Sequence, residues 1–226
     1  MPYPAEHRAR TRARITECAR MLFNRHGYDN VTIDMVMQAA DLTRGGFYHH
    51  FASKEDLFAA SVSSFLMGRG ARWRSEAGVD AADPAVEDAA NMLRSYLSPD
   101  HLGDVEGQCP MIALPSDVAR AGPAVREAYG RLLAAMVGLY ERALPADAAD
   151  RRRAALALSA LSVGGMILAR TIDDPALGQE VRQAALATAI GMLGPAGGDA
   201  TAAEGLAACL PEPPPPPLSA AVPPPH

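Results

Sequence analysis

The chain has 226 residues, of which 49% are hydrophobic and 21% are charged, and its formal net charge is -5. This length suffices for a buried core, and the composition excludes a wholly disordered chain. The charge is unevenly distributed: residues 1–74 hold 11 basic and 7 acidic residues, whereas the remainder holds 10 and 19. A basic N-terminal part on an acidic remainder is typical of a DNA-binding protein whose second part has another task.

The cysteines and the apolar stretches indicate a cytoplasmic protein. Cys18, Cys109 and Cys209 are widely spaced and contain no CxxC pair, which fits a reducing compartment and argues against a zinc site. We expect no metal and no cofactor. The arginine-rich N-terminus lacks the apolar run of a signal peptide. The longest apolar stretch, residues 154–169, is shorter than the roughly 18 residues that a membrane span needs, so we expect no membrane partner.

The first predicted helix covers residues 8–26. Ile15, Ala19 and Phe23 recur along it at helical spacing, and Gly27 follows as a terminator. Several arginines precede this apolar face. We interpret them as an arm that helps to hold the DNA backbone, with an ordinary solvated arm as the alternative; they are Arg8, Arg10, Arg12 and Arg14.

Residues 31–58 predict a helix-turn-helix. Thr32 can cap a short amphipathic helix that ends near Asp41. Thr43 is placed to cap a second helix over residues 44–50, and a capping box beginning at Ser53 starts a third. Two short helices joined by three or four residues form this motif. The small core that we predict for it consists of Phe23, Ile33, Val36, Leu42, Phe47 and Phe51, with Tyr28 inside it or at its edge.

The second helix of the motif is intrinsically weak. Gly45 and Gly46 each cost about 1 kcal/mol relative to Ala, and Arg44 places a cation at the positive helix end. A DNA major groove would compensate, because Arg is the commonest bidentate partner of guanine and glycines let the backbone approach closely. The alternative is a solvated helix hairpin. The candidate DNA-binding residues are Thr32, Thr43, Arg44, Gly45, Gly46, Tyr48, His49, His50 and Lys54.

This segment resembles the DNA-binding segment of the TetR family of bacterial transcriptional regulators. The resemblance covers residues 10–58 and departs from the family at Gly46, where Thr, Ala or Ser is expected. It implies a ligand-responsive repressor that binds a palindromic operator in double-stranded DNA as a homodimer and is released by a small-molecule effector. The residues that carry it are Thr32-Ile33, Ala39-Ala40, Leu42-Thr43-Arg44-Gly45, Phe47-Tyr48-His49-His50-Phe51 and Ser53-Lys54-Glu55-Asp56-Leu57.

The rest of the chain also predicts helices, with no competing strand pattern. A long connecting helix runs from Ser53 to about residue 77, and prolines then mark the starts of further helices. These cover about 84–98, 110–120, 123–144, 147–172 and 175–194. We therefore predict an all-α protein of about nine helices. Its parts are a three-helix helix-turn-helix domain at 8–58, a helical regulatory and dimerisation domain at 59–194, and a proline-rich, extended or disordered tail at 195–226.

The last two predicted helices carry apolar stripes that indicate a dimer surface. The alternative is that both stripes face the core of a single chain. The resemblance favours dimerisation, because in that family the last two helices typically form a four-helix interface with their symmetry mates. The stripe residues are Leu158, Leu161, Gly165, Leu168, Ile172, Val181, Ala185, Ala189 and Met192.

Methionines and tyrosines on the preceding helices indicate a ligand pocket, although such a pattern is more often plain core. Cys109 before Pro110 would place a sulfur at a helix N-terminus, which favours thiolate and suggests a redox or electrophile sensor. The alternative there is a semi-buried cap residue. The candidate pocket residues are Met92, Tyr96, Cys109, Met111, Leu114, Tyr129, Leu133, Met136, Val137 and Tyr140.

Catalytic motifs are missing from the sequence. His49 and His50 are adjacent and diverge on a helix, and we find no Ser/His/Asp order, phosphate loop or HExxH motif. We therefore expect no enzyme activity. The competing class of function is a helical ligand-binding or interaction protein without a role on DNA.

Overall fold

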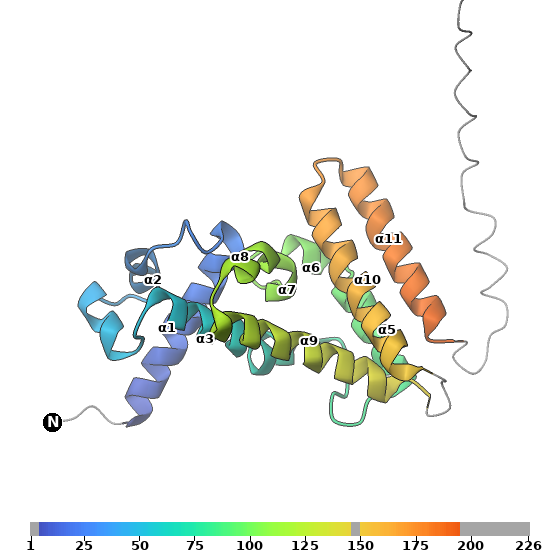
Figure 1. Ribbon diagram of the computed structural model, residues 1–226, viewed down its shortest axis with the longest axis horizontal. Helices are drawn as coiled ribbons and strands as arrows, with labels where there is room; N and C mark the ends of the chain where they lie inside the picture. The colour runs from blue at the N-terminus through green and yellow to red at the C-terminus, as the bar shows by residue number, and fades with distance from the viewer. Residues whose placement is uncertain (1–4, 146–149, 195–226) are drawn as a thin grey trace, which may run out of the picture. The chain divides into compact units, whose positions relative to one another are not determined.

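The computed structural model describes residues 5–145 and 150–194, and every regular element in these ranges is a helix (Figure 1). The all-α prediction is confirmed, but these residues form eleven α-helices rather than about nine. The N-terminal elements are α1 (Ala5–His26), α2 (Ile33–Ala39), the 3₁₀ helix η1 (Arg44–His49) and α3 (Lys54–Met67). The others are α4 (Arg69–Glu76), α5 (Val86–Tyr96), α6 (Pro99–Gly103), α7 (Pro110–Ala113), α8 (Pro115–Arg120), α9 (Pro123–Ala143), α10 (Arg151–Thr171) and α11 (Pro175–Met192).

The predicted helix from Ser53 to residue 77 is wrong in one respect, because it breaks at Gly68 into α3 and α4. A Cβ atom on Gly68 would lie 2.8 Å from the carbonyl oxygen of Ser64, and one on Gly70 would lie 2.8 Å from the Phe65 ring. Arg74 then donates a hydrogen bond of 2.8 Å to the carbonyl of Leu66. Two glycines thus let α4 fold tightly against the end of α3.

Two further boundaries differ from the prediction. The expected helix at 110–120 divides into α7 and α8 at Leu114, because Pro115 supplies no N–H to continue the first helix. The short helix α6 was not expected, although Ser98 accepts a hydrogen bond from the His101 N–H and Pro99 fills the first helical position. The two features depend on Pro115 and on Ser98 with Pro99, which hydrophobic periodicity does not reveal.

One continuous hydrophobic core runs from the N-terminal helices into the rest of the described chain. Phe23, Val36, Phe47 and Phe51 are buried as predicted, whereas Ile33, Leu42 and Tyr28 are half-buried. Helix α3 packs against both α1 and α9 and so joins the two parts of the core. A domain boundary at residue 58 therefore stays a prediction, and the predicted tail at 195–226 lies outside the described residues.

Helices α10 and α11 lie side by side and run in opposite directions (Figure 1). Gly165 permits their close approach, because a Cβ atom there would lie 2.8 Å from the Cβ of Ala185. The estimate that the apolar stretch is too short for a membrane span needs correction. Helix α10 has 21 residues and, by length and composition alone, is one described helix that could cross a membrane. Core helices of globular proteins also meet this criterion, and α10 packs against α9 and α11.

Candidate DNA interface and ligand cavity

One side of the 3₁₀ helix η1 is buried by aromatic packing. The Phe47 side chain is fully buried and its ring stacks on Phe51, with 5.7 Å between the ring centroids. The Tyr48 ring packs edge-on against Phe47, with 5.2 Å between the centroids, and the side chain remains 63% exposed. The second helix of the motif is a 3₁₀ helix rather than an α-helix, which agrees with its weak helical propensity. The buried phenylalanine fixes which side of η1 faces solvent.

Two arginines of the expected DNA-binding arm instead fasten the end of η1 to α1. Arg8 donates a hydrogen bond of 2.8 Å to the carbonyl of His49, and Arg12 donates to the carbonyl of His50. The guanidinium carbon of Arg12 also lies 3.9 Å from the centroid of the Phe51 ring. Arg10 pairs with Glu6. Arg12 is half-buried and Arg8 is exposed, and both hold the end of η1 in the free protein. Their contact with the DNA backbone stays a prediction.

Arg44, the expected base-contacting residue, is paired within the motif. Its Nη1 atom lies 2.5 Å from Oδ2 of Asp34, in the first turn of α2. The side chains are 64% and 56% exposed, so water screens this ion pair and the guanidinium remains accessible. The free protein therefore presents Arg44 at the surface, but beside a carboxylate.

The remaining candidate DNA-binding residues differ in their exposure to solvent. Lys54 lies over the Tyr28 ring, 4.1 Å from its centroid, and partial burial lowers its pKa. The pKa of His50 is lowered by burial and by the nearby Arg8 and Arg12, and its Nδ1 atom is buried without a partner. His50, Lys54 and Gly46 are half-buried, whereas the exposed candidates are Thr32, Thr43, Arg44, Gly45, Tyr48 and His49.

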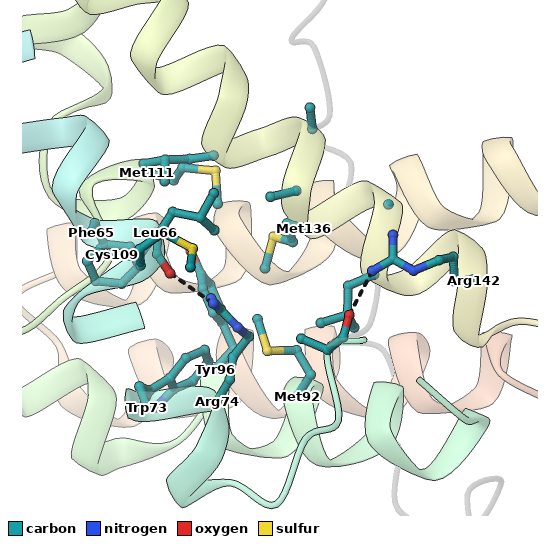
Figure 2. A pocket seen from close by; sticks show the side chains of 17 residues that line it. Phe65, Leu66, Trp73, Arg74, Met92, Tyr96, Cys109, Met111, Met136 and Arg142 are labelled. Atoms are coloured by element: carbon teal, nitrogen blue, oxygen red, sulfur yellow. Dashed lines mark hydrogen bonds between the residues drawn. The ribbon is translucent and has the colours of Figure 1, made fainter. Parts of the chain in front are cut away.

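A cavity of about 290 Å³ lies among α3, α4, α5 and α9 (Figure 2). Five of the predicted pocket residues line it: Met92, Tyr96, Cys109, Met111 and Met136. The other five do not. Leu114, Val137 and Tyr140 are buried in the core, Tyr129 is half-buried and donates to the Met111 carbonyl, and Leu133 is 38% exposed.

Sequence reasoning missed the part of the cavity wall that α3 and α4 supply. This part consists of Phe65, Leu66, Met67, Trp73 and Arg74, and α9 adds Arg142. A continuous helix to residue 77 would have carried Trp73 and Arg74 away from Phe65. The signal that could have revealed the break is the pair Gly68 and Gly70.

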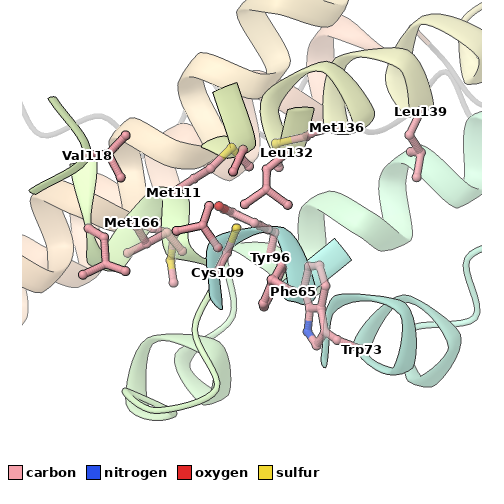
Figure 3. Close-up of a cluster of buried hydrophobic side chains, with 14 of the residues drawn as sticks. Phe65, Trp73, Tyr96, Cys109, Met111, Val118, Leu132, Met136, Leu139 and Met166 are labelled. Carbon is pink, nitrogen blue, oxygen red and sulfur yellow. The ribbon is translucent and has the colours of Figure 1, made fainter. Parts of the chain in front are cut away.

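Cys109 is buried in the apolar cluster around this cavity (Figure 3). Its side chain is 2% exposed, and burial raises the pKa of the thiol to about 11. The helix that follows it, α7, has only four residues. The expected thiolate is therefore corrected to a protonated thiol at neutral pH, because desolvation outweighs the dipole of so short a helix.

A polar cluster connects the cavity wall to α1. Gln108, next to Cys109, accepts a hydrogen bond of 2.5 Å from Arg170 of α10. The Asn24 side chain on α1 donates to the Gln108 carbonyl at 2.8 Å, and the Asn24 carbonyl accepts from Arg170 at 3.1 Å. Arg20, also on α1, donates to the Glu106 carbonyl at 2.6 Å. The segment before α7 therefore binds the helix that carries the N-terminal motif.

The family model described as "Bacterial regulatory proteins, tetR family" matches residues 15–61, which run from α1 through η1 into α3. The chain belongs to the TetR family. This is a family of regulators and not of enzymes, which agrees with the expectation of no catalytic activity. Within the described residues, no group of three His, Cys, Asp or Glu side chains could hold a metal ion.

Curated relatives align with this TetR-family chain over its N-terminal part. The HTH-type transcriptional repressor Rv1474c of Mycobacterium tuberculosis is 41% identical over 61 residues, and the repressor AcnR of Corynebacterium glutamicum is 42% identical over 50. These alignments cover 26% and 22% of this chain. They cover 33% and 27% of the relatives, so the likeness spans a third or less of each relative's length.

Solved structures extend the likeness in fold to most of the chain. A TetR-family regulator from Cytophaga hutchinsonii gives a TM-score of 0.67 at 19% identity, covering 82% of this chain and 96% of that one. The reduced form of NemR from Escherichia coli gives 0.64 at 17% identity, covering 80% and 96%. At these identities the comparison shows the shared fold and leaves the ligand open.

The structure divides the expected dimerisation stripes of this TetR-family protein between two faces. Leu158, Gly165, Ala185 and Ala189 are buried in the chain's own core, which is the alternative considered for them. Leu168 and Met192 are exposed, and Leu161, Ile172 and Val181 are half-buried. Leu156 and Leu177 were not predicted but are each 45% exposed on the same helices. The outer face of α10 and α11 thus presents large apolar side chains to solvent.

Proposed function

We propose that this protein is a cytoplasmic transcriptional repressor that binds an operator in double-stranded DNA through η1. The observation that carries the proposal is the arrangement of η1 on α1, with Phe47 buried beneath it and Tyr48 and Arg44 at the surface. A short exposed helix on a rigid support is suited to the major groove. Arg44 then reads base edges, and Thr43, Tyr48 and His49 donate to phosphates.

The protein acts as a homodimer through the outer face of α10 and α11, defined by Leu156, Leu168, Leu177 and Met192. Large apolar side chains that are 36–53% exposed on adjacent helices favour burial against a second copy. Gly164 supports the same face, since no atom lies within 4 Å of an added Cβ there. Two N-terminal motifs related by a two-fold axis match the two halves of a palindromic operator.

A small molecule in the cavity releases the operator. Phe65 and Leu66 of the cavity wall lie on α3, which packs against α1, and Cys109 adjoins the polar cluster of Gln108. A ligand that moves α4 or the segment before α7 therefore changes contacts that hold α1. Differential binding to two such arrangements is what a ligand needs to shift the equilibrium between them.

A redox trigger at Cys109 is the weaker candidate, since the buried thiol is neutral and 2% exposed. A ligand-binding protein without a DNA role is opposed by the family match over residues 15–61. No observation in the described residues favours either alternative over an operator-binding repressor.

Mobility-shift assays with the DNA upstream of the protein's own gene test the proposal. Wild type should shift this DNA. Arg44→Ala should bind it more weakly and should lose the preference for this DNA over unrelated DNA. Lys54→Ala should weaken binding to every sequence and flatten its salt dependence. A wild-type protein that binds no DNA from its own promoter region or the neighbouring genes would overturn the DNA-binding role.

Sedimentation of the free protein tests the dimer separately. Leu168→Glu should dissociate it, because the carboxylate lies on the outer face of α10 and α11. Leu133→Glu is the matched control, since Leu133 is 38% exposed on α9. A wild type that is monomeric at micromolar concentration, or equal behaviour of the two variants, would exclude this interface.

A further inference from the structure

The cavity wall includes two arginines, the half-buried Arg74 and the exposed Arg142, which donates to the Ala81 carbonyl, and, among the described residues that line it, no carboxylate. Arg74 comes from α4 and Arg142 from α9. Figure 2 shows them at opposite ends of the cavity, with Met92 and Met136 between them. The cavity is therefore positive in a part of the chain whose overall charge is negative.

Arg74 has no carboxylate partner within the described residues. Its neighbour on α4, Arg69, pairs with Glu76 at 3.2 Å and with Asp104 at 3.3 Å. Arg74 instead donates to the carbonyl of Leu66 and is half-buried. One carbonyl leaves most of the five N–H donors of a guanidinium without a partner. A cation partly withdrawn from water is stabilised by an anion placed beside it.

The residues next to Arg74 supply a further donor and no anion. The Cys109 thiol is protonated, as its raised pKa of about 11 shows. The Tyr96 side chain is 1% exposed, and its buried hydroxyl is paired with the Cys109 thiol. Sulfur is a weak acceptor, so a carboxylate is a stronger partner for this hydroxyl. Arg74 and Tyr96 both line the cavity, and each carries a donor suited to a carboxylate.

The remainder of the cavity wall is apolar and adaptable. It includes four methionines, whose flexible thioethers adjust to ligands of irregular shape, together with the rings of Phe65 and Trp73 and the side chains of Leu132 and Leu139. Such a wall favours a hydrocarbon or aromatic body over a sugar or a nucleotide, whose many polar groups would find few partners.

We propose that the effector is an apolar organic acid. Its carboxylate binds Arg74 and the Tyr96 hydroxyl, and its apolar body extends past Met92 and Met136 toward Arg142. This assignment rests on the proposed function only for the ligand's role as an effector. The chemistry of the cavity by itself determines the ligand class.

Binding can be measured without DNA, because Trp73 is the single tryptophan of the sequence and lines the cavity. Decanoate, 1-decanol and decylamine serve as probes with the same apolar body and different head groups. The pH is kept constant, since the His101 ring lies 5.0 Å from the Trp73 ring. Decanoate should change the Trp73 emission and bind about tenfold more tightly than decanol, with decylamine the weakest.

Three variants locate the carboxylate. Arg74→Gln should bind decanoate and decanol equally, and Tyr96→Phe, which keeps the ring, should lose several-fold in decanoate affinity alone. Arg142→Gln is the control, because it removes the cation at the far end and should keep most of the preference. Circular dichroism verifies folding. The comparison of the three probes on wild type tests the ligand class even if Arg74→Gln does not fold.

Wild type that binds decanol as tightly as decanoate, or decylamine more tightly, would overturn the proposal. So would folded Arg74→Gln and Tyr96→Phe proteins with an unchanged preference for decanoate. Decanoate binding that leaves operator DNA bound would refute release by this ligand and would leave the ligand class standing. Failure to bind DNA at all would refute the repressor function and would not alter the fluorescence result.

Discussion

Arg44 and Asp34 form an ion pair of 2.5 Å across the turn of the helix-turn-helix, so the side chain expected to read bases is held beside a carboxylate in the free protein. We predict that Asp34→Asn raises affinity for DNA of any sequence several-fold, because it removes a negative charge close to the phosphates and releases Arg44. Fluorescence anisotropy with the operator and with unrelated DNA measures the effect.

The control measurement for this prediction is the free energy of unfolding of Asp34→Asn. The pair is exposed, so Asp34→Asn should change the free energy of unfolding by less than about 1 kcal/mol. A variant that keeps its stability but binds the operator more weakly than wild type would show that Asp34 orients Arg44 in the complex.

Gly45 and Gly46 allow the same substitution to be compared at adjacent positions. An added Cβ meets nothing within 4 Å at Gly45, and at Gly46 it lies 3.6 Å from Cε of Met37, an ordinary contact. We predict that Gly45→Ala and Gly46→Ala each leave stability unchanged or raise it by up to about 1 kcal/mol. Only Gly45→Ala should weaken DNA binding, because its methyl group would occupy the exposed surface that approaches the duplex.

Thermal unfolding and mobility-shift assays on the two variants give the measurements for these glycines. Equal DNA affinities for Gly45→Ala and Gly46→Ala would contradict the close approach of the backbone at Gly45. Lower stability of Gly46→Ala would instead contradict the ordinary contact with Met37.

His101 should make stability depend on pH. Its Nδ1 lies 2.8 Å from the Tyr96 carbonyl and its Nε2 lies 3.4 Å from the Cys109 nitrogen. A carbonyl only accepts and an N–H only donates, so Nδ1 carries the proton and Nε2 is bare. Burial, the largest cause, lowers the pKa of His101 below 6.5. The folded state therefore resists a proton that the unfolded chain accepts.

The direction in which stability changes with pH follows from this difference in proton uptake between the folded and unfolded states. Stability is highest above about pH 6.5 and falls as the pH drops toward the lowered pKa, by up to about 1.4 kcal/mol for each pH unit. His101→Asn, whose amide can donate to the Tyr96 carbonyl, should reduce this slope. Part of the slope should remain in this variant, because the pKa of His50 is also lowered. Denaturant unfolding at about pH 7.5 and about pH 5.5 measures the slope, with His26→Asn as a matched substitution at an exposed position. An unchanged slope in His101→Asn would refute the assignment.

Gly165 should be intolerant of any side chain. The added methyl of Gly165→Ala would lie 2.8 Å from the Ala185 Cβ and 3.3 Å from the Leu97 Cδ2. We predict a loss of about 1–3 kcal/mol in the free energy of unfolding from overpacking. Gly130→Ala, in an open position on α9, should instead gain up to about 1 kcal/mol. Denaturant unfolding that ranks the two variants in the opposite order would exclude the tight α10–α11 contact.

The sequence by itself determined the N-terminal motif, because its signals are local. Thr32 and Ser53 cap α2 and α3 as expected, accepting hydrogen bonds of 3.2 and 3.0 Å from the backbone three residues on. The predicted cap at Thr43 is wrong, because its side chain accepts no hydrogen bond from the backbone of η1. The buried Phe47 and Phe51 followed from spacing alone. The helical class of the remainder also followed from proline punctuation and the lack of strand alternation.

Tertiary structure decided what depends on residues far apart in the chain. The local pair Gly68 and Gly70 permits the fold-back of α4, but the cavity that Arg74 enters is completed by α5 and α9, which follow later in the chain. Burial among such distant residues also keeps the Cys109 thiol neutral. Packing of α10 against its neighbouring helices likewise leaves Leu158 buried and Leu168 exposed, although both belong to one predicted apolar stripe. Helical periodicity identifies which residues share a face, whereas only the packed neighbours determine what that face meets.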